Sequence, residues 1–182
     1  MSYKNLLTYK QSEEIYDLTV LFCERYFPGR ENLRIREQMV HAARSAKQCI
    51  AEGATQGTSL KGYIKMLGVS RGSLEELLED YLDISRQRKI IVLLRGDKRV
   101  EMVKRVDLEG KIKILFPSYS PPSPSYSPSF PSKPSSLALS YFVDLIKRTN
   151  YLLDRQIKSL EEKFVREGGY TENLFKKRLQ NR

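Results

Sequence analysis

Two stretches decide the fold: Gln38-Met-Val-His-Ala-Ala-Arg-Ser-Ala-Lys-Gln-Cys-Ile-Ala-Glu-Gly53 and Met66-Leu-Gly-Val-Ser-Arg-Gly-Ser-Leu-Glu-Glu-Leu-Leu-Glu-Asp-Tyr81. Both are predicted to form helices, and both carry small residues where a core usually has large ones. If the two helices form a hairpin that turns near residues 56–57, Ala43 faces Ser70 and Ala46 faces Leu67. Small side chains at these positions allow the two backbones to approach closely.

Two glycines, Gly68 and Gly72, lie inside the second predicted helix. A glycine inside a helix costs about 1 kcal/mol relative to alanine, so we expect a packing role for both. The predicted helix-packing residues are therefore Ala43, Ala46, Gly68 and Gly72. The spacing Gly68-x-x-x-Gly72 lies within a helix, so it is not interpreted as a phosphate-binding loop.

Three short motifs in these stretches resemble a known family: Arg44-Ser45, Ile50-Ala-Glu-Gly53 and Arg71-Gly-Ser-Leu-x-Glu-Leu77. In order and spacing they are similar to the paired signatures of the bacterial four-helix-bundle family. That family is also called the ribosomal-RNA intervening-sequence protein family, and accessory proteins of diversity-generating retroelements are its relatives. The resemblance covers roughly residues 8–88.

The resemblance implies an all-α fold, an antiparallel up-down-up-down four-helix bundle. A basic, Pro/Ser-rich insertion would separate its third and fourth helices. The resemblance also implies a ring-like homo-oligomer, a pentamer, and it implies no established biochemical activity. The ending from Asn150 onward resembles a branch with a C-terminal four-helix-bundle suffix. The family usually has asparagine before Ile-Ala-Glu-Gly, whereas this chain has Cys49, so a role of that asparagine is not carried over.

Changes in composition divide the chain into regions. We expect the first three helices in residues 1–88, a basic insertion in 89–116, a Pro/Ser-rich linker in 117–136, the fourth helix in 137–167 and the suffix in 168–182. The linker should be an extended tether, since it cannot bury enough surface to offset the entropy of ordering.

Several local structures are also predicted. Thr8 and Gln11 have the spacing of a capping box at the start of the first helix. Apolar runs at 90–94 and 112–116 are expected to pair as short strands, with a brief helix between them. Gly168-Gly169 should end the fourth helix.

Composition restricts the possible chemistry. The two cysteines, Cys23 and Cys49, fall on different predicted helices without metal-like spacing, so we expect two buried thiols. His41 is the only histidine, which leaves little material for a zinc site or a histidine-based nucleophile system. The acids of residues 75–83 are expected to face solvent or a basic neighbour rather than a metal. We therefore predict no catalytic residues, no metal, no cofactor and no enzyme activity.

Hydropathy gives an expectation about location. The 182 residues contain no apolar run of 18 or more, so no membrane span or membrane partner is expected. The first eight residues lack the long apolar core of a signal peptide. We therefore expect a cytoplasmic protein, and the family resemblance implies a bacterial one.

A net charge of +10 indicates attraction to polyanions, nucleic acid first. The densest excess lies at residues 86–113, with ten Lys and Arg against four acids, and on a short helix some of them could form one basic ridge. Arg36 is expected to bridge to Glu76 or Glu79, whereas Arg44 has no obvious acidic neighbour. The candidate nucleic-acid-binding residues are Arg44, Lys47, Lys98, Arg99, Lys104, Arg105, Lys176, Lys177 and Arg178.

Two functional hypotheses follow. The first is a non-enzymatic, oligomeric protein that binds structured RNA or another nucleic acid, such as DNA, through phosphate contacts. The alternative is a protein–protein scaffold for a nucleic-acid enzyme, docked through the acidic face of the third helix. A solvated basic segment that only aids solubility also remains open.

Overall fold

The structure is a computed structural model that describes residues 2–56, 59–117 and 133–180. These residues form seven α-helices, two short 3-10 helices at Tyr3–Asn5 and Arg30–Asn32, and no strand. The predicted all-α class is therefore confirmed. Within the described ranges, no helix is both long and apolar enough to cross a membrane.

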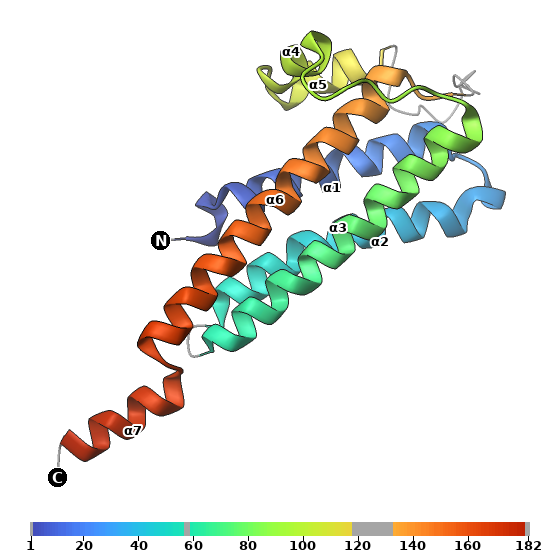
Figure 1. The fold of residues 1–182 in the computed structure, drawn as a ribbon. Helices are drawn as coiled ribbons and strands as arrows, with labels where there is room; N and C mark the ends of the chain where they lie inside the picture. The colour runs from blue at the N-terminus through green and yellow to red at the C-terminus, as the bar shows by residue number, and fades with distance from the viewer. Residues whose placement is uncertain (1, 57–58, 118–132, 181–182) are drawn as a thin grey trace.

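Four long helices make up the body of the molecule: α1 (Leu7–Tyr26), α2 (Leu33–Thr55), α3 (Leu60–Arg88) and α6 (Ser136–Glu167). Consecutive long helices run in opposite directions (Figure 1). The helix α3 packs along both α2 and α6, and α1 also contacts both α2 and α6. Each long helix therefore turns one apolar face towards a shared core.

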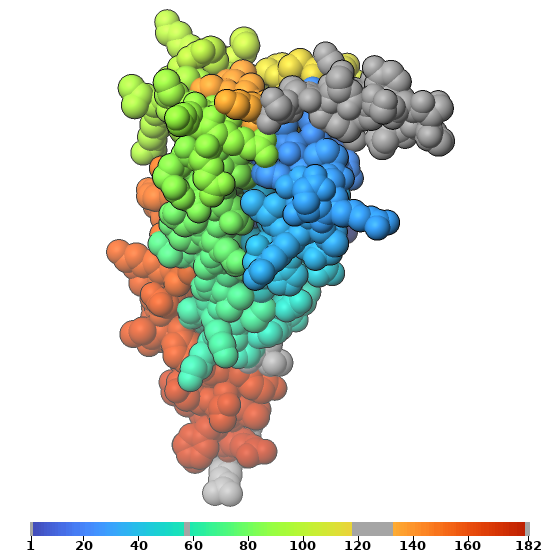
Figure 2. Space-filling model, turned by 90° about the vertical axis from the view of Figure 1, so that its right-hand side faces the viewer, coloured from blue at the N-terminus to red at the C-terminus, as the bar shows by residue number. Residues whose placement is uncertain are grey.

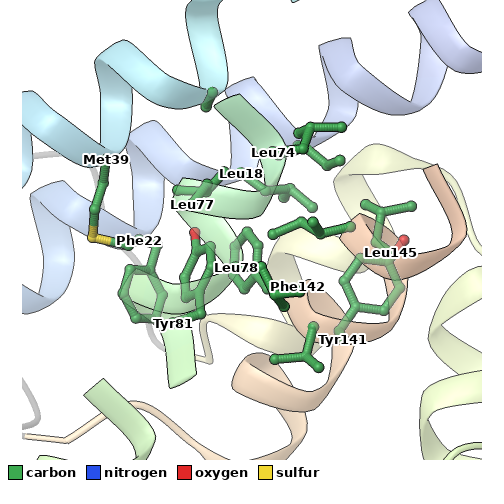
Figure 3. Close-up of a cluster of buried hydrophobic side chains, with 14 of the residues drawn as sticks. Leu18, Phe22, Met39, Leu74, Leu77, Leu78, Tyr81, Tyr141, Phe142 and Leu145 are labelled. Carbon is green, nitrogen blue, oxygen red and sulfur yellow. The ribbon is translucent and has the colours of Figure 1, made fainter. Parts of the chain in front are cut away.

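The centre of the core is aromatic. The rings of Tyr81 and Phe142 are stacked, with centroids 4.4 Å apart, and Phe22 meets both rings edge-on at 5.1 and 5.4 Å (Figure 3). The Tyr81 hydroxyl is 3.0 Å from the Thr19 hydroxyl, which satisfies both buried polar groups. Such ring pairs contribute about 0.5–1.5 kcal/mol beyond the burial of their area. Helices α1, α3 and α6 are thus joined at one point.

The helices α2 and α3 approach closely through small side chains, as the sequence predicts. Ala43 and Ala46 are fully buried. The register differs from the prediction, however, because Ser70 donates its hydroxyl hydrogen to the carbonyl oxygen of Ala46 at 2.9 Å. A second contact joins the hydroxyls of Ser45 and Ser73 at 3.0 Å. The hairpin is therefore centred later along the chain than residues 56–57.

The predicted packing role of Gly68 and Gly72 is wrong within this chain. Both glycines are exposed on α3, and a Cβ atom added at either would have no neighbouring heavy atom of the described structure within 4 Å. The positions of α3 that face its partners are instead Leu67, Ser70 and Leu74. At 3.6 residues per turn the two glycines fall on the outer side of the helix.

The strands predicted at 90–94 and 112–116 are absent. Residues 90–94 have no regular structure, and residues 112–115 belong to α5 (Leu108–Leu115). A shorter helix, α4 (Lys98–Lys104), precedes it. The side chain of Asp97 caps α4, and that of Asp107 caps α5 by accepting from the Gly110 amide at 2.9 Å.

The two short helices are part of the core rather than a solvated loop. Val103 and Leu115 are fully buried, and Phe116 is 1% exposed. In Figure 1 both helices lie at one end of the long helices. The linker prediction falls largely on residues 118–132, which lie outside the described residues.

The predicted capping box is also wrong. The helix α1 begins at Leu7, and the buried Thr8 hydroxyl donates to Gln156 Oε1 at 2.9 Å. Gln11 Oε1 accepts from the Thr149 hydroxyl at 3.0 Å. These polar side chains join α1 to α6 instead of closing the helix end.

The end of α6 matches the prediction. Gly168 has a φ of +76°, which favours glycine, and its amide bonds to the Phe164 carbonyl oxygen. A last helix, α7 (Tyr170–Gln180), follows. Figures 1 and 2 show it projecting beyond the four long helices.

Candidate nucleic-acid interface

The structure does not bring the nine predicted cations onto one surface. They lie on α2, around α4 and on α7, and Figure 1 places α4 and α7 at opposite ends of the molecule. The three groups are Arg44 and Lys47; Lys98, Arg99, Lys104 and Arg105; and Lys176, Lys177 and Arg178.

The prediction that Lys104 joins its neighbours in one basic ridge is wrong. Its ammonium lies 2.5 Å from Glu101 Oε1 and 2.8 Å from Asp144 Oδ2, and its side chain is only 15% exposed. Lys104 follows the buried Val103 and lies one turn after the buried Val100, so α4 turns it towards α6. This cation joins two elements of the fold.

Asp144 is held by a second cation as well. Arg148 Nε lies 2.9 Å from the same Oδ2 atom, one turn along α6. Neither this oxygen nor Arg148 Nε has a hydrogen bond of acceptable angle within the described structure. The carboxylate is therefore stabilised by the charge of Lys104 and Arg148 rather than by aligned hydrogen bonds.

Lys111 joins α5 to α1 in a similar way. Its ammonium lies 2.8 Å from Glu14 Oε1, and the side chains are 10% and 22% exposed. Glu14 also accepts from the Tyr141 hydroxyl. Burial, followed by this bond and the charge of Glu14, raises the pKa of Tyr141. Nearby, the buried Arg25 donates from Nη2 to the Pro117 carbonyl oxygen at 2.7 Å.

Other cations around α4 remain available. Lys98 and Arg105 are exposed and make no ion pair with any described residue. Arg99 is 62% exposed, but its guanidinium binds the Asp97 carboxylate through Nε and Nη2 at 3.0 and 2.9 Å. Lys98 and Arg105 are therefore the free charges of this predicted group.

The two α2 candidates differ from each other. Arg44 is exposed and has no acidic partner in the described part of the chain. The ammonium of Lys47 lies 4.5 Å from the centre of the Tyr16 ring, a cation–π contact. The bridge predicted from Arg36 to Glu76 or Glu79 is absent, since no ion pair of Arg36 is found among the described residues.

The cations of α7 are the most available. Lys176, Lys177 and Arg178 are all exposed, and none is ion-paired within the described ranges. The same helix exposes four apolar side chains, at Tyr170, Leu174, Phe175 and Leu179. This helix therefore presents both free charge and uncovered apolar area.

The acids of α3 show a different electrostatic character. Glu75 accepts from Asn150 Nδ2 at 2.9 Å, whereas Glu76 and Glu79 are exposed and have no cationic partner in the described structure. Burial, and then the charges of Glu76 and Asp83, raise the pKa of Asp80. No group of three or more His, Cys, Asp or Glu side chains within the described ranges is placed to hold a metal ion.

Both thiols are buried and free, as predicted. Burial raises the pKa of Cys23 to about 12. Burial also raises the pKa of Cys49, whose sulfur lies 4.0 Å from the Ser45 hydroxyl. Burial therefore favours the neutral thiol at both positions.

Comparison with known proteins gives the family. The family model described as the 23S rRNA-intervening sequence protein matches residues 4–106, more than half of the 182 residues. The chain belongs to this family. No curated protein and no solved structure matches it. The family match begins before α1 and ends just after α4, so it includes Lys98 and Arg105 but not α6 or α7.

Sequence analysis did not single out two further unpaired cations, Arg95 and Lys147. Both are exposed, neither has an acidic partner among the described residues, and both line one cavity. They are 52 positions apart in the sequence, and they line the same cavity only because residues 92–96 lie over α6. The one local signal is that Lys147 and Tyr151 share a face of α6 at a spacing of four.

Proposed function

We propose that this protein is a non-enzymatic, cytoplasmic protein that binds structured RNA or other nucleic acid through phosphate contacts. The observation that carries the proposal is the set of exposed cations without acidic partners, in a member of the 23S rRNA-intervening sequence protein family. Phosphate contacts of this kind position a nucleic acid without reading its sequence.

The contacts are assigned to Arg44, to Lys98 and Arg105 beside α4, and to the three cations of α7. When an unpaired cation of the protein binds a phosphate, it displaces a salt cation that was condensed on the nucleic acid. A cation that is already held by a carboxylate must first lose that partner. Lys104 is excluded for this reason, because two carboxylates surround its ammonium.

We further propose that the four long helices form an up-down-up-down bundle that assembles as a homo-oligomer. The support is the outer face of α3, where Gly68 and Gly72 flank Val69, which is 44% exposed. The two glycines have no side chain at these positions, which lets a second helix approach α3 closely there. At micromolar concentration, sedimentation should give a mass above that of one chain, and Gly72→Leu should lower that mass without unfolding. A mass of one chain for the wild type would contradict the assembly.

Binding should be tested on the full chain across salt concentrations with one structured RNA. The test variant Lys176→Gln/Lys177→Gln/Arg178→Gln removes three unpaired cations. The control Arg86→Gln/Lys113→Gln/Lys163→Gln removes three exposed cations that are ion-paired within the chain. Each phosphate contact contributes about 0.7–0.9 to the slope of log affinity against log salt. The test variant should therefore lower this slope by about 2.1–2.7, and the control should leave it unchanged.

A wild-type chain that binds no RNA at low salt would contradict the proposal. It would favour the alternative, a scaffold for a nucleic-acid enzyme, which one observation supports. Glu76 and Glu79 are exposed on α3 without cationic partners in the described structure, and the half-buried Asp80 adds charge beside them. This acidic side of α3 suits a basic protein partner.

A further inference from the structure

One cavity lies outside the predicted interface, between α6 and the chain that follows α3. Its volume is about 550 Å³, which falls in the range of small-molecule sites. Residues 92–96 form one wall, Val100 of α4 closes one end, and a face of α6 from Ser140 to Tyr151 forms the other wall. The cavity lies between elements that are fixed to one another.

Hydrogen bonds hold the wall of residues 92–96 in place. The Leu93 amide donates to the Ser140 hydroxyl at 2.8 Å, and that hydroxyl donates to the Ser136 carbonyl oxygen at 2.6 Å. The Ser136 hydroxyl in turn donates to the Ile91 carbonyl oxygen. Because these bonds bind the segment to α6, the cavity is largely formed before any ligand arrives.

The cavity combines an apolar wall with unbalanced positive charge. Val92, Val100 and Val143 supply apolar surface. Three cations line the cavity, Arg95, Lys147 and Arg148, together with one carboxylate, Asp144. That carboxylate is already paired with Arg148 and with Lys104. Arg95 and Lys147 therefore keep their full charge for a ligand. A bound anion would find two cations and no free carboxylate.

An aromatic side chain completes the set. Tyr151 lines the cavity one turn beyond Lys147, and it is 59% exposed. Its ring is not packed into the core, and the only ring-face contact of Tyr151 in the described structure is the Arg155 guanidinium at 6.0 Å. An exposed tyrosine beside two free cations is the arrangement that stacks a base while neutralising its phosphate.

We propose that this cavity binds one unpaired nucleotide of an RNA strand. The base lies against Val92, Val100 and Val143 and stacks on Tyr151. The phosphate binds Arg95 and Lys147. This inference rests on the proposed function and gives it a specific site: an unpaired base held in a pocket, in addition to the phosphate contacts along the surface.

The test uses the full chain and adenosine 5′-monophosphate as the probe, with inorganic phosphate and ribose 5-phosphate in parallel. Calorimetry or NMR titration should show saturable binding of the nucleotide to the wild type. Arg95→Gln/Lys147→Gln should abolish it. Tyr151→Ala should weaken it by about tenfold, the effect of losing one stacking contact. The matched control Lys61→Gln/Lys65→Gln removes two exposed cations of α3 that have no ion pair among the described residues and lie outside the cavity, and it should leave nucleotide binding unchanged.

A second arm separates RNA from a free nucleotide as the ligand. A single-stranded hexanucleotide should compete with the probe, and a blunt RNA duplex should not. Failure of the single strand to compete would overturn the inference, as would phosphate binding as tightly as the nucleotide or no saturable binding at all. If the nucleotide does not bind but structured RNA still binds with its full salt dependence, the cavity assignment fails and the proposed function stands. If structured RNA does not bind either, both fail.

Discussion

The segment around α4 and α5 and the C-terminal helix α7 are both rich in cations, yet they use them differently. In the first, Lys104 and Lys111 are paired with Asp144 and Glu14, acids that belong to α6 and α1. In α7, three consecutive cations have no acidic partner in the described structure. The number of cations in a segment therefore does not give the charge that a ligand can reach. That charge depends on which carboxylates another helix places within about 4 Å of each cation, the distance of an ion pair.

The same contrast holds for small residues on α2 and α3. Ala46 and Ser70 are buried where the two helices meet, whereas Gly68 and Gly72 face away from every described neighbour. Small residues at a helix contact serve packing within the chain. On an outer face, as at Gly68 and Gly72, they leave room for a helix of another molecule to approach closely.

The largest effect is expected where a buried ion pair is broken. Glu14→Ala leaves the Lys111 ammonium, which is 10% exposed, without a carboxylate and removes the acceptor of the Tyr141 hydroxyl. The free energy of unfolding should fall by about 3–5 kcal/mol in urea denaturation. Glu109→Ala, in the exposed pair with Lys113, is the control and should cost under about 1 kcal/mol. Equal losses would mean that the pair between α5 and α1 is no more important to the fold than the exposed pair within α5.

A smaller, opposite effect is expected on the outer face of α3. Gly72→Ala should raise the free energy of unfolding by about 0.5–1 kcal/mol, because alanine is the better helix former and its methyl group meets no atom of the chain. The measurement is urea denaturation at low protein concentration. The buried change Ala46→Gly is the comparison, and it should destabilise. A loss of stability for Gly72→Ala would place this face inside the fold.

A still smaller effect is expected from Asp80. Burial and the nearby acids raise its pKa in the fold above the ordinary 3.8, so the native state binds a proton more tightly than the unfolded chain. Its contribution to stability therefore falls as the pH rises through and above 3.8. At pH 7, Asp80→Asn should stabilise by up to about 0.5 kcal/mol, since solvent screens this half-buried site. The gain should vanish at pH 3, and a gain that persists there would show that charge is not its cause.

Much of the fold could be predicted because it depends on local periodicity. The apolar spacing of α1, α2, α3 and α6 recurs over many turns. The pair Gly168-Gly169 indicates the end of α6 in the sequence, and Gly168 has the positive φ that glycine favours there. The strands were predicted wrongly because apolar runs of about five residues do not distinguish a strand from a short helix. Residues 112–115 belong instead to a helix that the side chain of Asp107 caps, whereas residues 90–94 have no regular structure and are held to α6 by side-chain hydrogen bonds.

The site was harder to predict because it depends on contacts between distant residues. Nothing near Lys104 in the sequence indicates Asp144, 40 positions later, as its partner. Arg95 and Lys147 line the same cavity only because residues 92–96 pack over α6. Thr8 and Gln11 have the spacing of a cap, but their partners are on α6. In each case the packing of one helix on another decides the role of the side chain.

The most direct measurement stays within residues 98–113 and compares two doubly substituted chains. Lys98→Gln/Arg105→Gln removes two unpaired cations. Lys104→Gln/Lys113→Gln removes two cations that are paired within the chain, and Arg148 remains beside Asp144 to support the fold. Circular dichroism should show both variants folded, and each is then titrated with the same structured RNA across salt concentrations. The first variant should lower the slope of log affinity against log salt by about 1.4–1.8, and the second should leave the slope as in the wild type. Equal changes in slope would contradict the claim that pairing within the chain decides which cations bind nucleic acid.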